Sequence, residues 1–442
     1  MRILSLTVLA LFLSVGVLRA QGVSSDDDPK RDQKSGNSQT TETKSTTPSP
    51  DDDELKKQVE ELRSQLQGMD EAVKELQTDR DALKKIKVSG YLQVNFEKSE
   101  LEKGLATDPY DGKDFIKSRF RLRRSRIKFQ YDGGLTNMVV QADYSNTGFS
   151  LKDAYLEFTE PWMKYFALRL GVFNRPNYEV EYSSSQRESP ERSRIISTLY
   201  PGERDLGAML TLSPEDLFTL QIAGFNNTFG GTFNQANPNF GTEPYYFMAR
   251  ATKSITLGDL GLDVGVHGRF GNVRANSAKV LESDVPTSGV ADSTLKVGDP
   301  VSRNWFGVEA QLYYDFFGGM KILGEYIVGS DVNTLSTAAP INPLRKRDFS
   351  GFYVMLVKNI GDEFQIAVKY DSYNPNTAIS EDKVNLVNEL TVNTLGLGIH
   401  NYTFPNVRLT LWYDMPSTTI NDRLLKTDPV DNLMTFRAQY KF

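Results

Sequence analysis

Apolar and polar residues alternate at every second position from residue 87 to the end of the chain. The last ten residues are the clearest case, with an apolar set and a polar set that interleave: Met434, Phe436, Ala438, Tyr440 and Phe442 against Thr435, Arg437, Gln439 and Lys441. Because successive side chains of a β-strand point to opposite faces, this alternation predicts strands with one apolar and one polar face. Roughly sixteen such runs follow one another, so residues 87–442 are expected to form one all-β domain.

The connections between these runs alternate in length. Some are tight turns, at residues 132–134, 160–162, 213–216, 317–319, 360–362 and 404–405. Longer polar stretches lie between them, at residues 99–117, 175–203, 229–243, 275–300, 332–345, 374–388 and 416–431. Short turns on one rim and long loops on the other are typical of transmembrane β-barrels, whereas a large soluble β-sandwich does not predict this order. We therefore expect a transmembrane antiparallel β-barrel of about 16 strands, with its short turns and both termini in the periplasm.

Parity assigns the charged side chains to the inner face of the barrel. In the run 306–316, Glu309 and Gln311 alternate with Val308 and Leu312. The runs 364–370 and 407–413 show the same separation of polar and apolar positions. Charges on the lipid face would cost a few kcal/mol each at mid-depth, so they are expected to point inward. A barrel of this width is too wide for such charges to pack as ion pairs in its core, and we expect a water-filled channel.

A different period precedes the strands. Apolar residues step by four and three positions along residues 54–86, at Leu55, Val59, Leu62, Leu66, Met69, Val73, Leu76 and Leu83, with Arg80 in one inner position. About four heptads of this kind predict a self-associating coiled coil, in which an inner arginine helps to set the register. A single amphipathic helix packed on a domain is the alternative.

The first residues and the composition limit the remaining possibilities. Residues 1–20 combine an early positive charge with a short apolar run and Ala20, which predicts an export signal. Residues 21–53 are rich in Ser, Thr, Asp and Pro and are expected to be a disordered spacer. There is no cysteine and there are two distant histidines, so neither disulfides nor a zinc site is expected, and we assign no metal and no cofactor. A net charge of −6 gives no global attraction to nucleic acid.

The end of the chain resembles the carboxyl-terminal signal of bacterial outer-membrane β-barrels. Phe436 and Tyr440 lie on the apolar face, and Phe442 is the last residue. The resemblance implies recognition by the barrel-assembly machinery, insertion into outer-membrane lipid and a periplasmic location for the coiled coil.

The second run of the barrel is strongly basic. With a bulge near residues 123–125 to switch parity, five side chains would line the wall together: Arg119, Arg121, Arg123, Arg126 and Lys128. Inward positions on one strand are about 6.6 Å apart, a spacing at which guanidiniums can pass an anion from site to site. The alternative is that these arginines pair with acids on the next strands, such as Asp143, Asp153 and Glu157.

The longest early connection follows the fifth run, at residues 175–203. Long loops usually serve a function, and in a wide barrel such a loop can fold inward and narrow the pore. Its arginines are therefore candidate constriction residues: Arg175, Arg187, Arg192 and Arg194.

Several motifs together resemble the phosphate- and polyphosphate-selective porin family. They are Leu-Lys-Asp-Ala-Tyr-Leu at 151–156, Leu-Gly-Val-Phe-Asn-Arg-Pro at 170–176, Glu-Arg-Ser at 191–193 and Gly-Glu-Arg-Asp-Leu-Gly at 202–207, preceded by the basic run 123–126. The likeness covers about residues 118–210. It implies a homotrimer of 16-stranded barrels, an arginine ladder, a third loop folded into the pore and passive diffusion of small anions such as phosphate. The family often has Lys where this chain has Asn174.

Three other functions fit parts of the pattern. A general, non-selective porin would contain similar barrel charges in paired form. An envelope tether would act through its coiled coil but leaves the basic column unexplained. An outer-membrane enzyme would need a nucleophile beside a base, and no serine motif accompanies His267, which we interpret as a solvated histidine of the lumen. We therefore predict that the protein is not an enzyme and has no catalytic residue.

Overall fold

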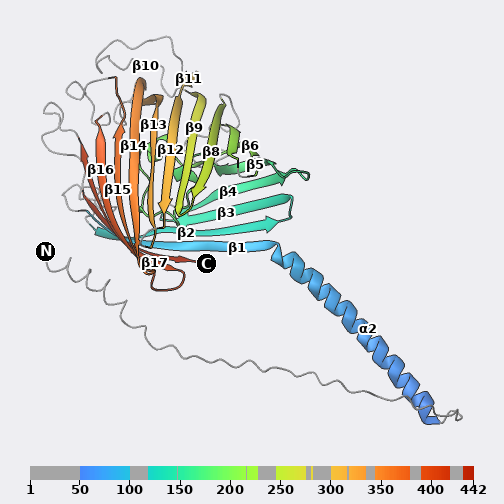
Figure 1. Ribbon diagram of the computed structural model, residues 1–442. Helices are drawn as coiled ribbons and strands as arrows, with labels where there is room; N and C mark the ends of the chain where they lie inside the picture. The colour runs from blue at the N-terminus through green and yellow to red at the C-terminus, as the bar shows by residue number, and fades with distance from the viewer. Residues whose placement is uncertain are drawn as a thin grey trace. The chain divides into compact units, whose positions relative to one another are not determined.

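The computed structural model separates the chain into two units, residues 1–86 and residues 87–442. The structure describes the following residues: 50–99, 118–146, 148–215, 217–226, 245–274, 280–281, 300–315, 318–334, 344–378, 390–418 and 432–442. The expected export signal, most of the spacer and most of the long polar connections lie outside them. Figure 1 gives the labels of the helices and strands.

The first unit contains one long helix, α2 (Pro50–Lys84). Its apolar heptad positions are 44–67% exposed, from Val59 at the low end to Leu76 and Leu83 at the high end. The predicted helix is therefore confirmed and ends close to the expected boundary, because β1 begins at Ile86. Its pairing with other helices stays a prediction. Among the described residues, no helix is both long and apolar enough to cross a membrane.

The second unit is a closed barrel. Its strands are β1 (Ile86–Ser99), β2 (Ser118–Asp132), β3 (Thr136–Ser145), β4 (Gly148–Thr159), β5 (Phe166–Asn174), β6 (Arg204–Leu212), β7 (Thr219–Phe225), β8 (Tyr246–Leu257), β9 (Leu260–Arg274), β12 (Asn304–Tyr314), β13 (Met320–Thr334), β14 (Leu344–Ile360), β15 (Phe364–Asn374), β16 (Val392–Asn401), β17 (Val407–Thr418) and β18 (Leu433–Lys441). Each pairs with its neighbour in this order, and β9 pairs directly with β12. The short strands β10 (Val280–Leu281) and β11 (Pro300–Ser302) add to the edges of β14 and β9.

The first and last strands close the ring. β1 and β18 run antiparallel, with Phe96 opposite Phe436, and β1 also pairs with β2. The amides of Gly90 and Phe442 each donate to the other residue's carbonyl oxygen at 3.0 Å. Eighteen strands less the two short ones leave a ring of sixteen, which confirms the predicted 16-stranded antiparallel barrel.

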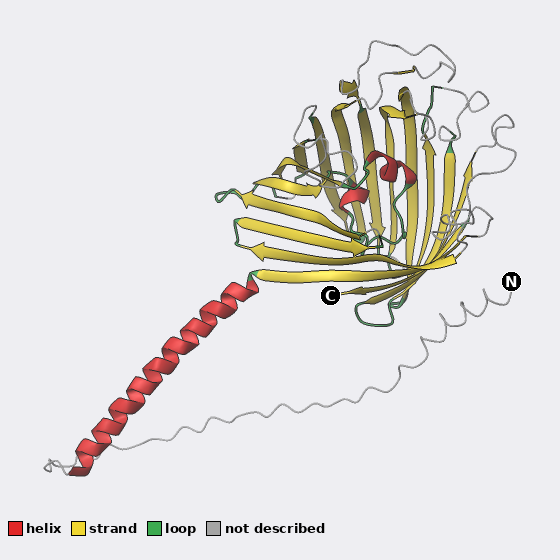
Figure 2. Ribbon diagram, turned by 180° about the vertical axis from the view of Figure 1, so that it is seen from behind, coloured by secondary structure: helices red, strands yellow, loops and turns green. Residues whose placement is uncertain are grey.

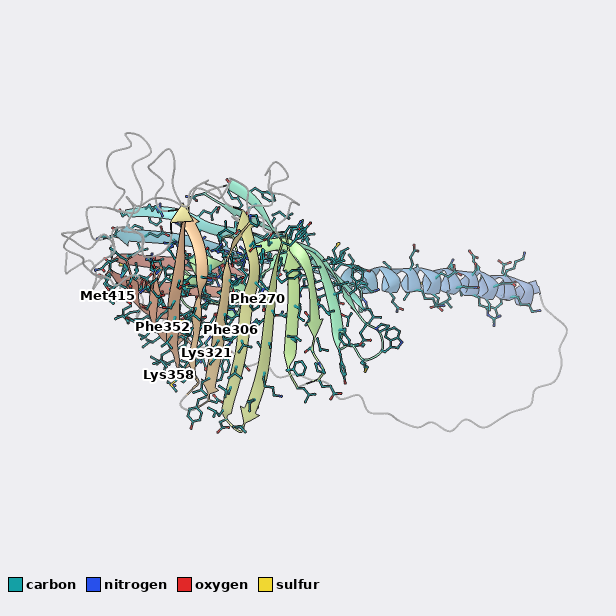
Figure 3. All side chains as sticks on the ribbon, turned by 90° about the horizontal axis from the view of Figure 1, so that it is seen from above. Phe270, Phe306, Lys321, Phe352, Lys358 and Met415 are labelled. Atoms are coloured by element: carbon teal, nitrogen blue, oxygen red, sulfur yellow. The ribbon has the colours of Figure 1, made fainter. Side chains whose placement is uncertain are left out.

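The two faces of the strands follow the predicted parity. On β18 the polar Thr435, Arg437 and Gln439 are buried, whereas Tyr440 is exposed. Glu309 and Gln311 of β12 are likewise buried. Phe270, Phe306 and Phe352, labelled in Figure 3, lie at exposed positions on their strands. The charged positions therefore face the interior and the apolar ones form the outer face.

Part of the interior is dry, which the sequence pattern did not predict. Buried apolar and aromatic side chains from β5 to β8, from β12 to β15 and from β17 form one cluster with a loop that enters the barrel; its members include Phe173, Phe225, Tyr246, Met248, Trp305, Leu323, Ile327, Phe349 and Tyr353. The expected water-filled channel therefore has only the remaining part of the interior, and it stays a prediction. The two short helices of the loop are visible inside the barrel in Figure 2.

The closure between the chain ends leaves no room for a side chain at residue 90. A Cβ at Gly90 would lie 2.4 Å from the backbone oxygen of Arg126 and 2.7 Å from Cζ of Phe442. We predict that Gly90→Ala lowers the stability of the barrel by about 1–3 kcal/mol, the usual cost of overpacking. The measurement is the temperature at which the folded band disappears in a heat-modifiable gel shift. Gly261→Ala is the control, because its Cβ would meet Tyr313 at an ordinary 3.5 Å. Equal unfolding temperatures for the two variants would contradict the prediction.

Candidate functional site

The connection between β5 and β6, residues 175–203, crosses the interior of the barrel and is called the inner loop here. It contains α3 (Tyr178–Glu181) and α4 (Arg194–Leu199). Asn177 caps α3 by accepting a hydrogen bond from the amide of Val180 at 3.1 Å. α4 contacts β14 and β15, and β15 lies eight strands away from β5 in the ring. The glycine at 351 makes this approach possible, since a Cβ there would lie 2.7 Å from Cδ1 of Ile195.

Polar contacts attach the inner loop to strands around the ring. Glu179 lies 3.4 Å from Nζ of Lys369 on β15. Glu188 pairs with Lys321 on β13 at 2.6 Å. Tyr91 of β1 shares a 2.8 Å hydrogen bond with Ser184, and Gln439 of β18 donates to the carbonyl of Ser185 at 3.0 Å. The loop is therefore held by charge and hydrogen bonds as well as by its apolar helix.

The basic column of β2 does line the interior, but most of its members have acidic partners. Arg119 and Arg121 lie 2.9 and 3.5 Å from Glu97 of β1. Arg126 pairs with Asp143 at 2.9 Å, as the alternative interpretation expected. The other two acids named there pair elsewhere, Asp153 with Arg204 and Glu157 with Arg169. The partners of the column therefore come from β1, β3 and the inner loop.

The change of parity on β2 adds a sixth basic side chain. Phe120 is 78% exposed on one side of the change and Phe129 is exposed on the other. Between them, Arg123 bonds to Glu191 of the inner loop, and Arg124 lies 3.5 Å from Glu203. The side chains of two successive arginines therefore both face the interior of the barrel. The predicted column did not contain Arg124, which lies within the bulge expected at residues 123–125.

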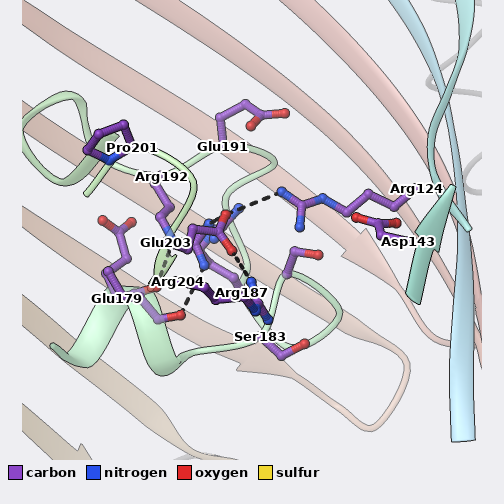
Figure 4. Close-up of polar contacts among 12 residues, drawn as sticks. Arg124, Asp143, Glu179, Ser183, Arg187, Glu191, Arg192, Pro201, Glu203 and Arg204 are labelled. Carbon is purple, nitrogen blue, oxygen red and sulfur yellow. Dashed lines mark hydrogen bonds and ion pairs between the residues drawn. The ribbon is translucent and has the colours of Figure 1, made fainter. Parts of the chain in front are cut away.

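Glu203 is the centre of a second basic cluster, shown in Figure 4. It accepts hydrogen bonds from Arg192 and, at 2.8 Å, from Arg204, and it also contacts Arg124. Its φ of 72° is rare for a residue with a side chain, so these contacts hold a strained backbone in place. Burial alone would raise the pKa of Glu203, but the three guanidiniums outweigh it and hold that pKa well below its usual range.

The four predicted constriction arginines take different places. Arg175 donates to the carbonyl of Pro201 at 2.6 Å, and Arg187 donates to the carbonyls of Ser189 and Pro190. Burial lowers the pKa of Arg187 to about 10. Arg192 belongs to the Glu203 cluster, and Arg194 is exposed at the start of α4. Arg192 also donates to the carbonyls of Glu179 and Val180. Three of the four therefore stabilise the loop's own fold, and a part in a constriction stays a prediction for all four.

A cavity of about 400 Å³ lies between the inner loop and the wall formed by β1 to β7. Its basic lining residues are Arg126, Lys128, Arg169, Arg192, Arg204 and Lys441, and its acidic ones are Asp153, Glu181 and Glu203. Six cations against three carboxylates leave a surplus of three positive charges. The column of β2 reaches into this cavity with Arg126 and Lys128, while Arg123 meets the loop at Glu191.

His267 is buried at 2% exposure, so the expectation of a solvated histidine is wrong. Its ring nitrogens lie 3.4 Å from the hydroxyl of Tyr200 and 3.4 Å from Glu325, and Glu309 is close enough to form a group of three potential metal ligands. The oxygens of this group already have donors. Arg250 binds both oxygens of Glu309, and Glu325 accepts from Asn177 and Tyr353 at 2.6 and 2.7 Å. The group is a hydrogen-bonded anchor for the inner loop.

Comparison with known proteins adds the fold family to this geometry. No sequence family and no curated protein matches the chain. Solved structures do match. The outer membrane channel DcaP of Acinetobacter baumannii is similar over 81% of this chain and 97% of its own, with 12% identity and a TM-score of 0.53. OprB of Pseudomonas putida is similar over 83% and 96%, with 11% identity and a TM-score of 0.53.

An anion-selective porin from Comamonas acidovorans is similar over 81% of this chain and 99% of its own, with 11% identity and a TM-score of 0.50. This chain has the porin fold. Agreement at this level of identity concerns the path of the backbone, so the porin fold by itself does not assign the basic residues of β2 to a substrate.

The lowered pKa of Glu203 predicts how acid affects the docked loop. A carboxylate whose folded pKa is lowered stabilises the fold above its unfolded pKa, about 4.3, and loses this contribution as the pH falls through the folded value. We predict that Glu203→Gln unfolds at a lower temperature than the parent at pH 5–7, and that the gap shrinks steadily below about pH 4.3.

The gel-shift temperature measured from pH 7 to pH 2 checks this expectation. Glu215→Gln, at an exposed turn, is the control and should show no gap at any pH. A gap for Glu203→Gln that stays constant down to pH 2 would mean that an ionised Glu203 does not hold the loop.

Proposed function

We propose that this protein is an outer-membrane porin that lets small anions diffuse through a water-filled channel. The observation that carries the proposal is the basic column of β2, which meets the inner loop at Arg123 and continues into the cavity at Arg126 and Lys128. The surplus of positive charge in the cavity supports it, because a cleft of one sign concentrates ions of the other. The chain's net charge of −6 does not oppose this, since many of its acids lie in residues 21–86.

Phosphate or polyphosphate is the leading permeant. The motifs at 151–156, 170–176 and 202–207 resemble the phosphate-selective porins, and a guanidinium fork suits the paired oxygens of a phosphate. Dicarboxylates also present a pair of oxygens to such a fork and are the next candidates.

A general, non-selective porin is the second candidate, and the ion pairs of the column favour it. Six basic side chains of β2, with Arg124 included, face four carboxylates: Glu97, Asp143, Glu191 and Glu203. Paired charges give a weaker field than free ones, and salt screens what remains. The difference of two charges still favours anions, so the two candidates differ in the degree of selectivity.

We predict that replacing Arg121, Arg123 and Arg126 together by Ala lowers the anion-to-cation permeability ratio by about tenfold, because the column supplies the local field. The ratio is obtained from reversal potentials of the purified protein in planar bilayers under a salt gradient. The control removes three lysines that lie near the short turns, Lys87, Lys253 and Lys358, and should leave the ratio close to that of the parent. Cation preference in the parent channel would refute the anion pathway.

We also infer that the protein is a homotrimer whose periplasmic α2 helices form a coiled coil. The exposed heptad stripe of α2 supports this inference, because an apolar seam of this length is stabilised by pairing. Leu62→Gln with Leu76→Gln should reduce the assembly to smaller species in mild detergent without changing the unfolding temperature of the barrel.

Light scattering of the detergent-solubilised full-length protein measures the assembly. Glu61→Gln with Glu75→Gln, on the polar side of the same helix, is the matched control and should leave the mass unchanged. A monomeric parent protein would refute both the trimer and the coiled coil.

A further inference from the structure

The side chain of Glu191 occupies a carboxylate site built by the wall of the barrel. Nε and Nη2 of Arg123 donate to its two oxygens at 2.7 and 2.6 Å, which is a side-on, bidentate contact. Arg121 and Arg437 lie 3.9 and 3.7 Å from the same carboxylate. The three guanidiniums come from β2 and β18, whereas Glu191 comes from the inner loop. The wall therefore forms the receptor, and the loop supplies the anion that fills it.

One donor of this receptor is still available. Arg437 is 2% exposed, and its Nη2 makes no hydrogen bond within the described part of the chain. That nitrogen lies 3.7 Å from Oε1 of Glu191, so it points into the site without being satisfied there. A buried donor without an acceptor is costly, and a second pair of oxygens in the site would relieve this cost.

Glu191 is the exposed partner of the contact. Its side chain is 49% exposed, whereas those of Arg123 and Arg437 are 19% and 2% exposed. The carboxylate can therefore rotate toward the open side of the site while the guanidiniums stay in place. By contrast, the side chain of Glu203 is only 15% exposed among its three arginines.

The backbone at this point of the loop is held independently of the Glu191 side chain. The carbonyl of Pro190 accepts from Arg437 and from Arg187, each at 3.1 Å, and Oγ of Ser189 donates to the carbonyl of Glu191 at 2.8 Å. These contacts remain when the Glu191 side chain rotates away. Exchange at the site thus needs a rotamer change of one side chain and no undocking of the loop.

The local charge favours a doubly charged replacement. Arg119, Arg121, Arg123 and Arg437 face two carboxylates, Glu97 and Glu191, which leaves a surplus of two positive charges. The surplus becomes three when Glu191 has moved into water. A solute with two negative charges is attracted more strongly to such a site than chloride is.

We propose that Glu191 is a tethered competitor for the anion site, and that solutes with a carboxylate or phosphate group enter by displacing its side chain from Arg123. This inference rests on the proposed function and describes how the entry of anions into the site is regulated. Desolvation by the surrounding barrel would raise the pKa of Glu191 even though its side chain is half-exposed, but the hydrogen bonds and charge of Arg123 outweigh this and hold that pKa well below its usual range. The competitor is therefore ionised at neutral pH, and every permeating anion has to exchange with it.

The test is block of the chloride current of the purified full-length protein in planar bilayers by succinate and, in a separate arm, by inorganic phosphate. Glu191→Gln should lower the half-blocking concentration about tenfold, because one competing charge-assisted contact is lost. Glu191→Asp keeps the charge but shortens the side chain by one methylene group, and should give an intermediate value. The arm with the larger change identifies the preferred oxygen geometry.

Glu188→Gln is the matched control, because it removes one carboxylate and one ion pair of the same loop on the other side, at Lys321. It should leave the half-blocking concentrations within about twofold of the parent. An equal decrease for Glu188→Gln and Glu191→Gln would overturn the proposal, since removal of any loop charge would then suffice. The proposal is also overturned if the parent channel prefers anions and Glu191→Gln does not lower the half-blocking concentration. A parent channel without anion preference would instead refute the proposed function.

Discussion

The packing of the inner loop against the wall determines what space remains inside the barrel. A ring of sixteen strands is wider than its own side chains can fill. α4 buries Ile195, Ile196 and Leu199 against the aromatic and aliphatic side chains of the facing wall, and apolar burial of this kind does not depend on salt or on the solute. The loop is thereby fixed against β14 and β15, across the barrel from the strand β5 that precedes it. A cavity of about 400 Å³ remains between the loop and β1 to β7, where Arg126 and Lys128 lie.

Ion pairs with the wall then define the exact position of the inner loop, which apolar packing has already placed inside the barrel. The loop carries Glu179, Glu188 and Glu191 to cations on three different parts of the wall, at Lys369, Lys321 and Arg123. Buried pairs such as the first two cost desolvation and contribute little net stability, but they allow only one placement of the loop. The third pair is half-exposed and is the one that water and solutes can reach. A single loop therefore combines fixed and exchangeable contacts.

The sequence predicted what depends on local periodicity. The alternation of apolar and polar residues at every second position was enough to predict the number of strands. It also predicted that Arg437 and Gln439 point inward and that Phe306 points outward. The heptads were enough for the helix of residues 50–84. These features follow from the geometry of single elements, in which neighbours in sequence are neighbours in space.

Contacts between distant parts of the chain were not predictable in the same way. Glu191 meets Arg123 across 68 positions, and His267 is buried because Tyr200 and Asn177 of the loop cover it. The apolar inward residues, among them Phe225 and Met248, interrupt the simple separation of polar and apolar faces because they belong to the buried cluster of the wall and the inner loop. Arg124 was missed because it lies within the bulge expected at residues 123–125, and the alternation does not determine which way a side chain inside a bulge points.

The last strand has a consequence for the order in which the molecule is made. β18 completes the ring against β1, and the same strand supplies Arg437 and Gln439 to the inner loop at Pro190 and Ser185. Tyr91, on the other side of that seam, bonds to Ser184. These partners are separated by about 90 to 250 positions and come together only when the seam is shut. A half-assembled barrel therefore lacks these contacts, and the inner loop reaches its final position only when the ring is closed.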